Sequence, residues 1–342
     1  MNYLPILFLV FAVACGDTQP PSATETLPAA GIYHWKTTFS TSGWESAFME
    51  RHRIGRLYLR FFDVDLDRWN PASAPQIVPV GTTRFPESPG SGMLVTPTVF
   101  ITVEALQAMK GQTADYAEKI TGRIMAMSRR HDMLRQIREV QIDCDWTRST
   151  QTLYFDLLRE IRTRLQKDSI RLGATIRLHQ LHQAAPPVDR GMLMLYNTGN
   201  VRDDDTRNSI LDEEDVAPYL RRKPTCDLPL DFAYPVFAWG IWFRDGAFKA
   251  ILHHTDFSDP DRYEPIGNNI FRVRKSHFLE NHQLRPDDRI RLDAPNPEQI
   301  LRVKQRVERL YATAESAVVL YHLDSLHLSQ FTDHEIEALY RR

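Results

Sequence analysis

Two carboxylates and an indole close the stretch at residues 139–147, which reads EVQIDCDWT. Side chains on a strand alternate between its faces, so Asp143 and Asp145 share one face with Gln141 and lie about 6.5 Å apart along the strand. Carboxylates held together beside apolar side chains are destabilised by desolvation and by repulsion between like charges. Because such arrangements concentrate at functional sites, we predict a site here. The alternative is that backbone groups or arginines satisfy both acids at the end of the strand.

Acidic and aromatic side chains also follow other apolar runs. A glycosidase uses two carboxyl groups about 5–10 Å apart, one protonated and one ionised, and Asp143 with Asp63 or Asp324 would supply them if these strand ends meet. Burial would raise the pKa of one carboxyl and leave the other low. We predict catalytic roles for Asp143, Asp145 and Asp63. We predict substrate contacts from Trp35, Trp146, Tyr196, Asn197, Trp239, Asp65 and Asp324, with Trp35 and Trp146 as stacking surfaces for a sugar ring.

The elements that must position these residues alternate between strands and helices. Apolar runs predict strands at residues 32–35, 56–62, 98–102, 139–147, 172–178, 191–196, 232–243 and 317–321. Helices are predicted at 115–131, 153–165 and 297–310, and a capping box at Ser42 and Glu45 begins another that runs to His52. About eight strands joined by helices favour the α/β class and a (β/α)8 TIM barrel. An open doubly wound sheet is the alternative.

Three segments are predicted as insertions, after the second, sixth and seventh strands. Residues 70–92 are rich in Pro and Gly, residues 201–222 are acidic and then basic, and residues 253–295 are polar, with Pro, Gly and Asn throughout. The last segment is too long for a simple loop, so we expect short strands within it. In a barrel, the C-terminal ends of all strands meet at one face, and that face carries the site. The scattered acids and aromatic residues would then form one constellation.

The N-terminal residues differ from the rest. Residues 1–14 form an apolar run that is too short to span a bilayer and ends in small residues. Ala12–Gly16 resembles the lipobox of bacterial lipoproteins, with Cys15 as the lipidated residue, although Ala replaces the usual Leu and no Lys or Arg precedes the run. An ordinary cleaved signal or an uncleaved anchor is the alternative.

We therefore predict a signal peptide at residues 1–14, a disordered tether at residues 15–30 and a barrel domain at residues 31–342. A lipid on Cys15 would anchor the protein to a membrane of the bacterial cell envelope, in the periplasm or at the cell surface.

Composition and motifs argue against several classes of function. The 342-residue chain has a net charge of −2 and no dense run of Lys or Arg, which argues against nucleic-acid binding. No Gly-rich phosphate loop or Ser nucleophile elbow occurs, and no cofactor is expected. The pairs His253–His254 and His179–His182 lack a recognised metal spacing, so no metal is expected. Cys144 is predicted to be a buried thiol, with a disulfide to Cys226 as the alternative.

Two short sequence motifs, which lie at the ends of the fourth and sixth predicted strands, resemble motifs of family 18 chitinases. Ile142–Trp146 resembles the fourth strand of those enzymes, which carries Asp-x-x-Asp-x-Asp-x-Glu, and Met194–Asn197 is similar to their sixth-strand Met-x-Tyr-Asp. The wider pattern, from Tyr-His-Trp in the first strand through Asn197, resembles a bacterial lipoprotein family of unknown function that is regarded as a glycosidase-like barrel. This resemblance implies the fold of residues 31–342 and a carbohydrate as ligand or substrate.

The departures from the chitinase pattern bear on mechanism. Alignment places Asp143 and Asp145 on its second and third acids, Val140 on its first acid, Thr147 on its catalytic Glu and Asn197 on the Asp of the second motif. A Thr hydroxyl cannot act as a general acid near neutral pH, because its pKa lies far from that range. The chitinase mechanism therefore lacks its proton donor in this chain.

Three hypotheses remain. The first is a lipid-anchored glycoside hydrolase whose proton donor comes from another strand; the candidates are Asp63, Asp65, Asp256 and Asp324. The second is a non-catalytic barrel that binds a carbohydrate through its aromatic side chains. The third is a purely structural envelope protein, against which the clustered acids argue.

Overall fold

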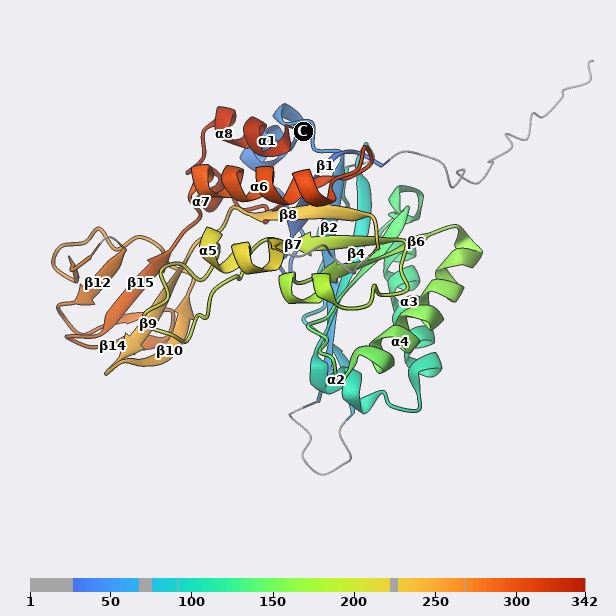
Figure 1. The fold of residues 1–342 in the computed structure, drawn as a ribbon, viewed down its shortest axis with the longest axis horizontal. Helices are drawn as coiled ribbons and strands as arrows, with labels where there is room; N and C mark the ends of the chain where they lie inside the picture. Colours follow the sequence, from blue (N-terminus) through green and yellow to red (C-terminus); the bar gives the residue numbers. More distant parts are fainter. Residues whose placement is uncertain (1–26, 68–75, 91, 222–226, 268, 342) are drawn as a thin grey trace, which may run out of the picture.

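Eight parallel strands close into a barrel in the computed structural model, which describes residues 27–67, 76–90, 92–221, 227–267 and 269–341. The barrel strands are β1 (Ala30–His34), β2 (Arg56–Leu66), β4 (Leu94–Ile101), β5 (Glu139–Asp143), β6 (Arg171–Ile176), β7 (Arg190–Met194), β8 (Leu230–Pro235) and β16 (Val318–Tyr321). The first strand, β1, pairs with both β2 and β16, so these eight strands close on themselves (Figure 1). The (β/α)8 prediction is confirmed and the open sheet is excluded.

The helices pack around the outside of the barrel. They are α1 (Gly43–Arg51), α2 (Val103–Ala108), α3 (Thr113–Arg130), α4 (Gln151–Leu165), α5 (Glu213–Val216), α6 (Pro297–Tyr311), α7 (Ser325–Leu328) and α8 (Asp333–Tyr340). Ser42 and Glu45 form the predicted capping box, and Asn296 caps α6 through the amide of Gln299. Only short helical turns follow β6 and β7 in the described chain, so the outer ring is uneven.

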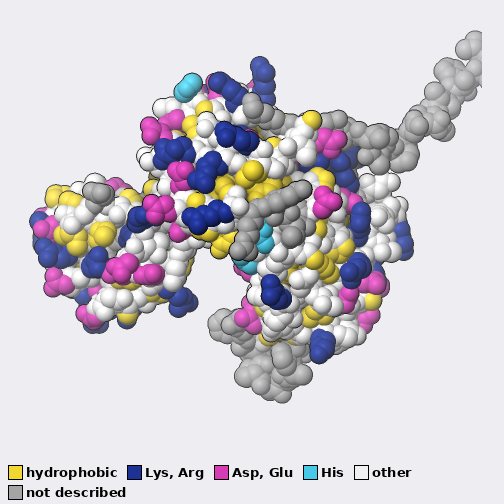
Figure 2. Space-filling model, viewed as in Figure 1, with side chains coloured by type: hydrophobic (Ala, Val, Ile, Leu, Met, Phe, Trp, Pro, Cys, Tyr) yellow, Lys and Arg dark blue, Asp and Glu magenta, His cyan; other side chains and the backbone are white. Residues whose placement is uncertain are grey.

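All three predicted insertions are present. After β2, β3 (Ile77–Val80) pairs antiparallel with β2, and α5 lies in the segment after β7. After β8, a separate lobe contains β9 (Trp239–Arg244), β10 (Ala247–Leu252), β11 (Tyr263–Pro265), β12 (Ile270–Val273), β13 (His277–Leu279), β14 (His282–Leu284) and β15 (Arg289–Asp293). The lobe stands apart from the barrel (Figures 1 and 2) and has its own small apolar core.

The single strand predicted over residues 232–243 is wrong. The barrel strand β8 ends at Pro235, and β9, which belongs to the lobe, begins at Trp239. The run is apolar throughout because its first half is buried in the barrel and its second half in the lobe. No polar turn therefore marks the boundary in the sequence.

The predicted N-terminal boundary also shifts. Ala30, assigned above to the tether, opens β1 and pairs with Val318. The predicted signal peptide, Cys15 and most of the tether lie outside the described residues, as does Cys226. Within the described part of the chain, no helix is both long enough and apolar enough to cross a membrane.

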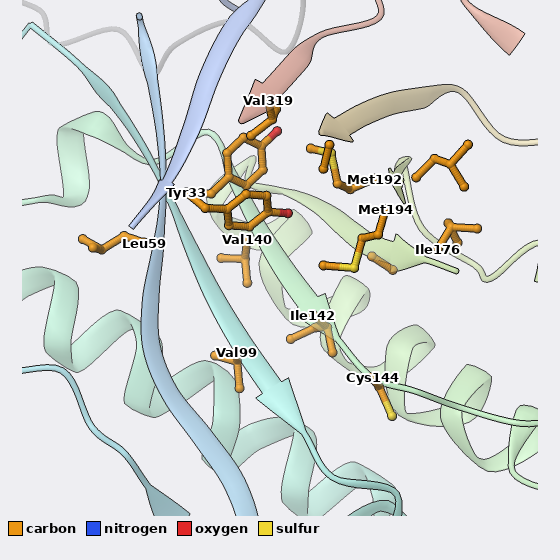
Figure 3. Close-up of a cluster of buried hydrophobic side chains, with 14 of the residues drawn as sticks. Tyr33, Leu59, Val99, Val140, Ile142, Cys144, Ile176, Met192, Met194 and Val319 are labelled. Carbon is orange, nitrogen blue, oxygen red and sulfur yellow. The ribbon is translucent and has the colours of Figure 1, made fainter. Parts of the chain in front are cut away.

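The strand β5 separates an apolar layer from a polar barrel interior. Val140, Ile142 and Cys144 have no exposed surface and share the face that the sequence predicted, with Cys144 a free buried thiol (Figure 3). The alternate residues Glu139 and Gln141 point into the barrel, where each meets a polar partner. Burying such groups is tolerated because each is hydrogen-bonded or ion-paired.

A buried ion pair fills the base of the barrel. The guanidinium of Arg56 contacts Glu139 at 2.7 Å and donates to Thr96 at 2.9 Å, and both charged side chains are at most 3% exposed. Gly173 faces this pair, because a Cβ at that position would lie 2.6 Å from Glu139 Oε1. The packing at the base of the barrel thus requires an Arg–Glu ion pair and a glycine beside it.

We expect Arg56→Met to lower the free energy of unfolding by about 3–5 kcal/mol, because Glu139 would remain buried without its cation. Urea denaturation measures this loss. The matched control is Arg51→Met, which removes an exposed ion pair to Asp333 and should cost less than about 1 kcal/mol. Equal losses in the two variants would contradict a structural role for the buried pair.

Candidate active site

One guanidinium binds both acids of the central motif. Asp143 ends β5, and Arg177 follows the neighbouring strand β6. Arg177 donates from Nη2 to Asp143 Oδ1 at 3.1 Å and from Nε to Asp145 Oδ1 at 2.5 Å. Thr175 on β6 donates its hydroxyl to the same Asp143 oxygen at 2.6 Å. The alternative that arginine satisfies both acids is thus what the structure contains, and the sequence analysis did not identify Arg177.

The two acids differ in environment. Burial raises the pKa of Asp143 above its ordinary value of 3.8, and the charges of Asp145 and Asp63 act in the same direction. Arg177 and the Thr175 hydrogen bond oppose this rise without cancelling it. The side chain of Asp145 is 56% exposed and reaches solvent above its buried neighbour. The pair therefore consists of one enclosed and one accessible carboxyl beside a single cation.

A cavity of about 360 Å³ opens over Arg177 at the C-terminal end of the strands. Its lining residues are Asp145, Arg177, Leu178, His179, Met194, Tyr196, Asn197, Thr198 and Tyr219. The buried hydroxyl of Tyr196 has no hydrogen-bond partner among the described residues, and its ring stacks on Tyr321 with centroids 4.7 Å apart. Asn197 adopts a left-handed backbone (φ 55°), which Asn tolerates better than most residues. The predicted residues Asp145, Tyr196 and Asn197 therefore share one cavity.

Asp63 and Trp35 lie at the same mouth, with Arg60 between them. Arg60 forms a two-point ion pair with Asp63, one bond of which is 2.9 Å long, and its guanidinium lies 5.7 Å from the Trp35 ring centre. The Trp35 ring also contacts Tyr321, with centroids 5.9 Å apart. Asp63 is near enough for its charge to raise the pKa of Asp143. Its own carboxylate, however, is occupied by Arg60.

The prediction that Trp146 stacks on a sugar is wrong. Its side chain has no exposed surface and packs against Tyr154 and Phe155 of α4, with ring centroids 6.0 and 5.4 Å away. Strand β5 ends at Asp143, and the chain then turns under α4. Trp146 therefore joins the apolar layer between barrel and helix, while Asp145 stays at the mouth.

Asp65 and Asp324 have structural partners. Asp65 accepts hydrogen bonds from the Thr102 hydroxyl at 2.9 Å and from the Leu66 amide at 2.8 Å. Asp324 caps α7 and forms an ion pair with Lys36 at 3.1 Å. Neither residue lines the cavity over Arg177. Their predicted substrate contacts stay predictions.

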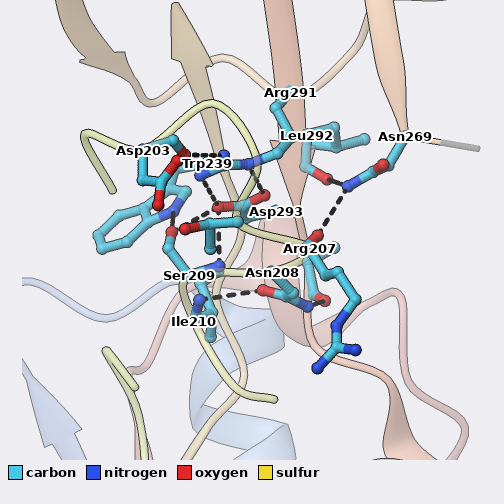
Figure 4. A network of polar contacts seen from close by, with 12 residues as sticks. Asp203, Arg207, Asn208, Ser209, Ile210, Trp239, Asn269, Arg291, Leu292 and Asp293 are labelled. Atoms are coloured by element: carbon cyan, nitrogen blue, oxygen red, sulfur yellow. Dashed lines mark hydrogen bonds and ion pairs between the residues drawn. The ribbon is translucent and has the colours of Figure 1, made fainter. Parts of the chain in front are cut away.

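Trp239 lies in a polar network that joins the lobe to the segment after β7 (Figure 4). Its indole donates to Ser209 Oγ at 3.2 Å, and Ser209 also bonds Asp293. Arg291 in turn contacts Asp293 at 2.8 Å. Trp239 thus anchors the lobe, and its predicted contact with substrate stays a prediction.

Two further positions concern the missing proton donor. Thr147 is exposed, and its hydroxyl bonds Ser149 at 2.8 Å in the turn before α4, so this position carries no carboxyl. Asp256 lies in the lobe and accepts from the Ser258 amide at 3.0 Å. Within the described residues, no three His, Cys, Asp or Glu side chains are arranged to hold a metal ion.

The chain is thus a closed (β/α)8 barrel with carboxylates and aromatic rings at the C-terminal mouth, the face on which such barrels carry their sites. No family model and no curated protein matches the sequence. Among solved structures, the chain is similar to a chitinase from Chromobacterium violaceum ATCC 12472, at 9% identity and a TM-score of 0.51 over 91% of this chain and 100% of that one.

It is also similar to the family 18 chitinase ChiB from the chitin utilization locus of Flavobacterium johnsoniae, at 12% identity and a TM-score of 0.51 over 92% and 94% of the two chains. At these identities the likeness shows the fold alone. The predicted fold and the distant similarity to family 18 chitinases are thereby confirmed.

We expect the stability that Asp143 contributes to depend on pH with a defined sign. Its pKa is raised on folding, so this contribution is fully present below the unfolded value and is lost as the pH rises through the folded value. The free energy of unfolding of the wild type should therefore fall relative to Asp143→Asn as the pH rises above 3.8. Urea denaturation from acid to neutral pH measures the difference, with the exposed Asp156→Asn as the matched control. If the free energy of unfolding of the wild type instead rose relative to that of Asp143→Asn as the pH increased, the raised pKa of Asp143 would be contradicted.

Proposed function

We propose that this barrel binds a carbohydrate at its C-terminal mouth without cleaving it. The observation that carries the proposal is the sharing of Arg177 between Asp143 and Asp145. Arg60 likewise forms an ion pair with Asp63, and Thr147 occupies the position at which the resemblance to chitinases would place the catalytic Glu. A glycosidase needs one protonated and one ionised carboxyl facing the scissile bond. Carboxylates held by arginines are instead suited to accept hydrogen bonds from sugar hydroxyls.

The cavity offers what sugar binding requires. The Tyr196 hydroxyl is buried and without a partner among the described residues, which costs free energy until a ligand pairs with it. Asn197 and Asp145 add an amide and an exposed carboxylate to the same cavity. Trp35, half-buried at the mouth, presents an aromatic surface beside Arg60. A few polar groups within a largely preformed cavity are typical of a small-ligand site.

Hydrolysis is the second candidate, and the raised pKa of Asp143 is the observation that favours it. A carboxyl whose pKa is raised by burial is better suited to general acid catalysis than an ordinary one. Asp145, exposed beside it, would then be the second carboxyl of the pair. Against this candidate, Asp143 is 4% exposed and enclosed by Thr175 and Arg177.

A glycan array with the full chain, followed by a hydrolysis assay on every bound glycan, tests the two candidates together. We expect binding with full recovery of intact glycan. Tyr196→Phe should weaken binding about 2- to 12-fold, because one hydrogen bond is lost. Tyr311→Phe is the matched control, since its buried hydroxyl also lacks a partner among the described residues but lies on α6 outside the cavity lining.

The outcomes separate the candidates. Cleavage that disappears in Asp143→Asn would establish the hydrolase and overturn the non-catalytic proposal. If no glycan binds, both the carbohydrate-binding candidate and the hydrolase candidate are overturned.

We further propose that a lipid on Cys15 anchors the protein to a membrane of the bacterial cell envelope, with the barrel in the periplasm or at the cell surface. The support is the apolar run at residues 1–14 and the lipobox-like sequence that ends it.

We expect Cys15→Ser to abolish incorporation of labelled palmitate and to move the protein from the membrane fraction to the soluble fraction of a bacterial host. Cys226→Ser is the matched control and should leave both unchanged. Palmitate incorporation that persists in Cys15→Ser would contradict the assignment of Cys15.

A further inference from the structure

The first described residues and the segment after α3 lie at the same end of the barrel. Pro28 packs against Gly55, whose amide donates to the carbonyl of Ala30 at 3.2 Å. The amide of Leu94 donates to Gly55 at 3.0 Å, and Val95 forms a parallel bridge with Ile137. These contacts connect the start of β1, β2 and β4 with residues 129–138 along one rim. The chain therefore enters the fold on the rim where α3 ends.

This rim is basic. Residues 129–138 read RRHDMLRQIR, with four Arg and one Asp, in a chain whose net charge is −2. The exposed arginines Arg53, Arg129, Arg130 and Arg135 form no ion pair with any described residue, and Leu134 beside them is 37% exposed. We call these five residues the basic rim. Elsewhere, over α6 and the lobe, Figure 2 shows basic and acidic side chains interspersed.

We infer that the basic rim docks on the surface of an anionic phospholipid membrane; this inference rests on the proposed anchoring at Cys15. Arginines are attracted to anionic lipid over about 8 Å, the screening length at physiological salt. The 12 residues at positions 16–27 separate Cys15 from the start of the fold, and a 12-residue linker has a typical end-to-end distance of about 20 Å. The anchor would thus hold the basic rim close enough to the membrane for its charges to act.

The choice of lipid over another anion follows from position. The chain that follows the apolar run at residues 1–14 enters the fold at this rim and not at the mouth. An exposed leucine among arginines suits the boundary between headgroups and acyl chains. A nucleic acid would use the same charges but would make no use of Leu134.

Docking in this manner would orient the site. The mouth, with Asp143 and Arg177, lies at the C-terminal ends of the strands, opposite the basic rim. It would therefore open away from the membrane, toward glycans in the aqueous phase.

Hydrogen exchange on the full, lipid-modified chain reconstituted in vesicles tests the inference. One vesicle preparation is phosphatidylcholine alone and the other contains one-third phosphatidylglycerol. We expect amide exchange across residues 129–138 to slow by about tenfold or more on the anionic vesicles only, and to recover in high salt. The triple variant Arg129→Glu, Arg130→Glu, Arg135→Glu should lose this slowing. The matched control reverses three charges on the lobe, at Lys249, Arg262 and Arg274, and should keep it.

Failure of docking and failure of anchoring give different results. If the protein sediments with both vesicle types but exchange at residues 129–138 is equal on both, the docking inference is overturned while the anchor stands. If it does not sediment with neutral vesicles, the anchor is overturned, and slowed exchange on anionic vesicles would still support docking. Slowing that survives in the arginine triple variant would also overturn the inference.

Discussion

Closure of the parallel sheet at β1 is the constraint on which the rest of the structure depends. With β1 paired to β2 and β16, all strand C-termini point to one mouth, and all inward side chains must satisfy one another. Strand β5 shows how this is done. Its inward residues Glu139, Gln141 and Asp143 rise through the barrel in steps of two, as a strand requires. Arg56, Tyr33 and Arg177 pair with them in turn.

The topmost of these pairs sets the chemistry of the mouth. Asp143 is buried deeply enough for its pKa to rise, yet it shares Arg177 with the exposed Asp145. Arg177 opposes this rise in the pKa of Asp143 without cancelling it, and its hydrogen bonds orient both carboxyl groups at the mouth. The unpartnered hydroxyl of Tyr196 extends the same cavity. The proposed recognition of a carbohydrate would therefore require no group beyond those already in place.

The two ends of the barrel differ in how their charged side chains are paired. Acids at the mouth are held by arginines, whereas Arg129, Arg130 and Arg135 at the opposite end have no ion-pair partner among the described residues. Parallel strands make this separation possible, because each connection returns the chain to the base before the next barrel strand begins. The proposed membrane-facing base and outward mouth would both follow from this one topology.

The sequence by itself determined the alternation of strands and helices, the helix cap at Ser42, the insertions and the face on which Asp143 lies, because these follow from local periodicity and capping chemistry. Only the tertiary structure decided which strand-end residues meet. Arg177 is 34 residues from Asp143 and reaches it because β6 lies beside β5. Trp146 follows Asp145 directly yet is buried under α4, because the chain turns there. Neighbours across a closed sheet are set by strand order, which no local pattern encodes.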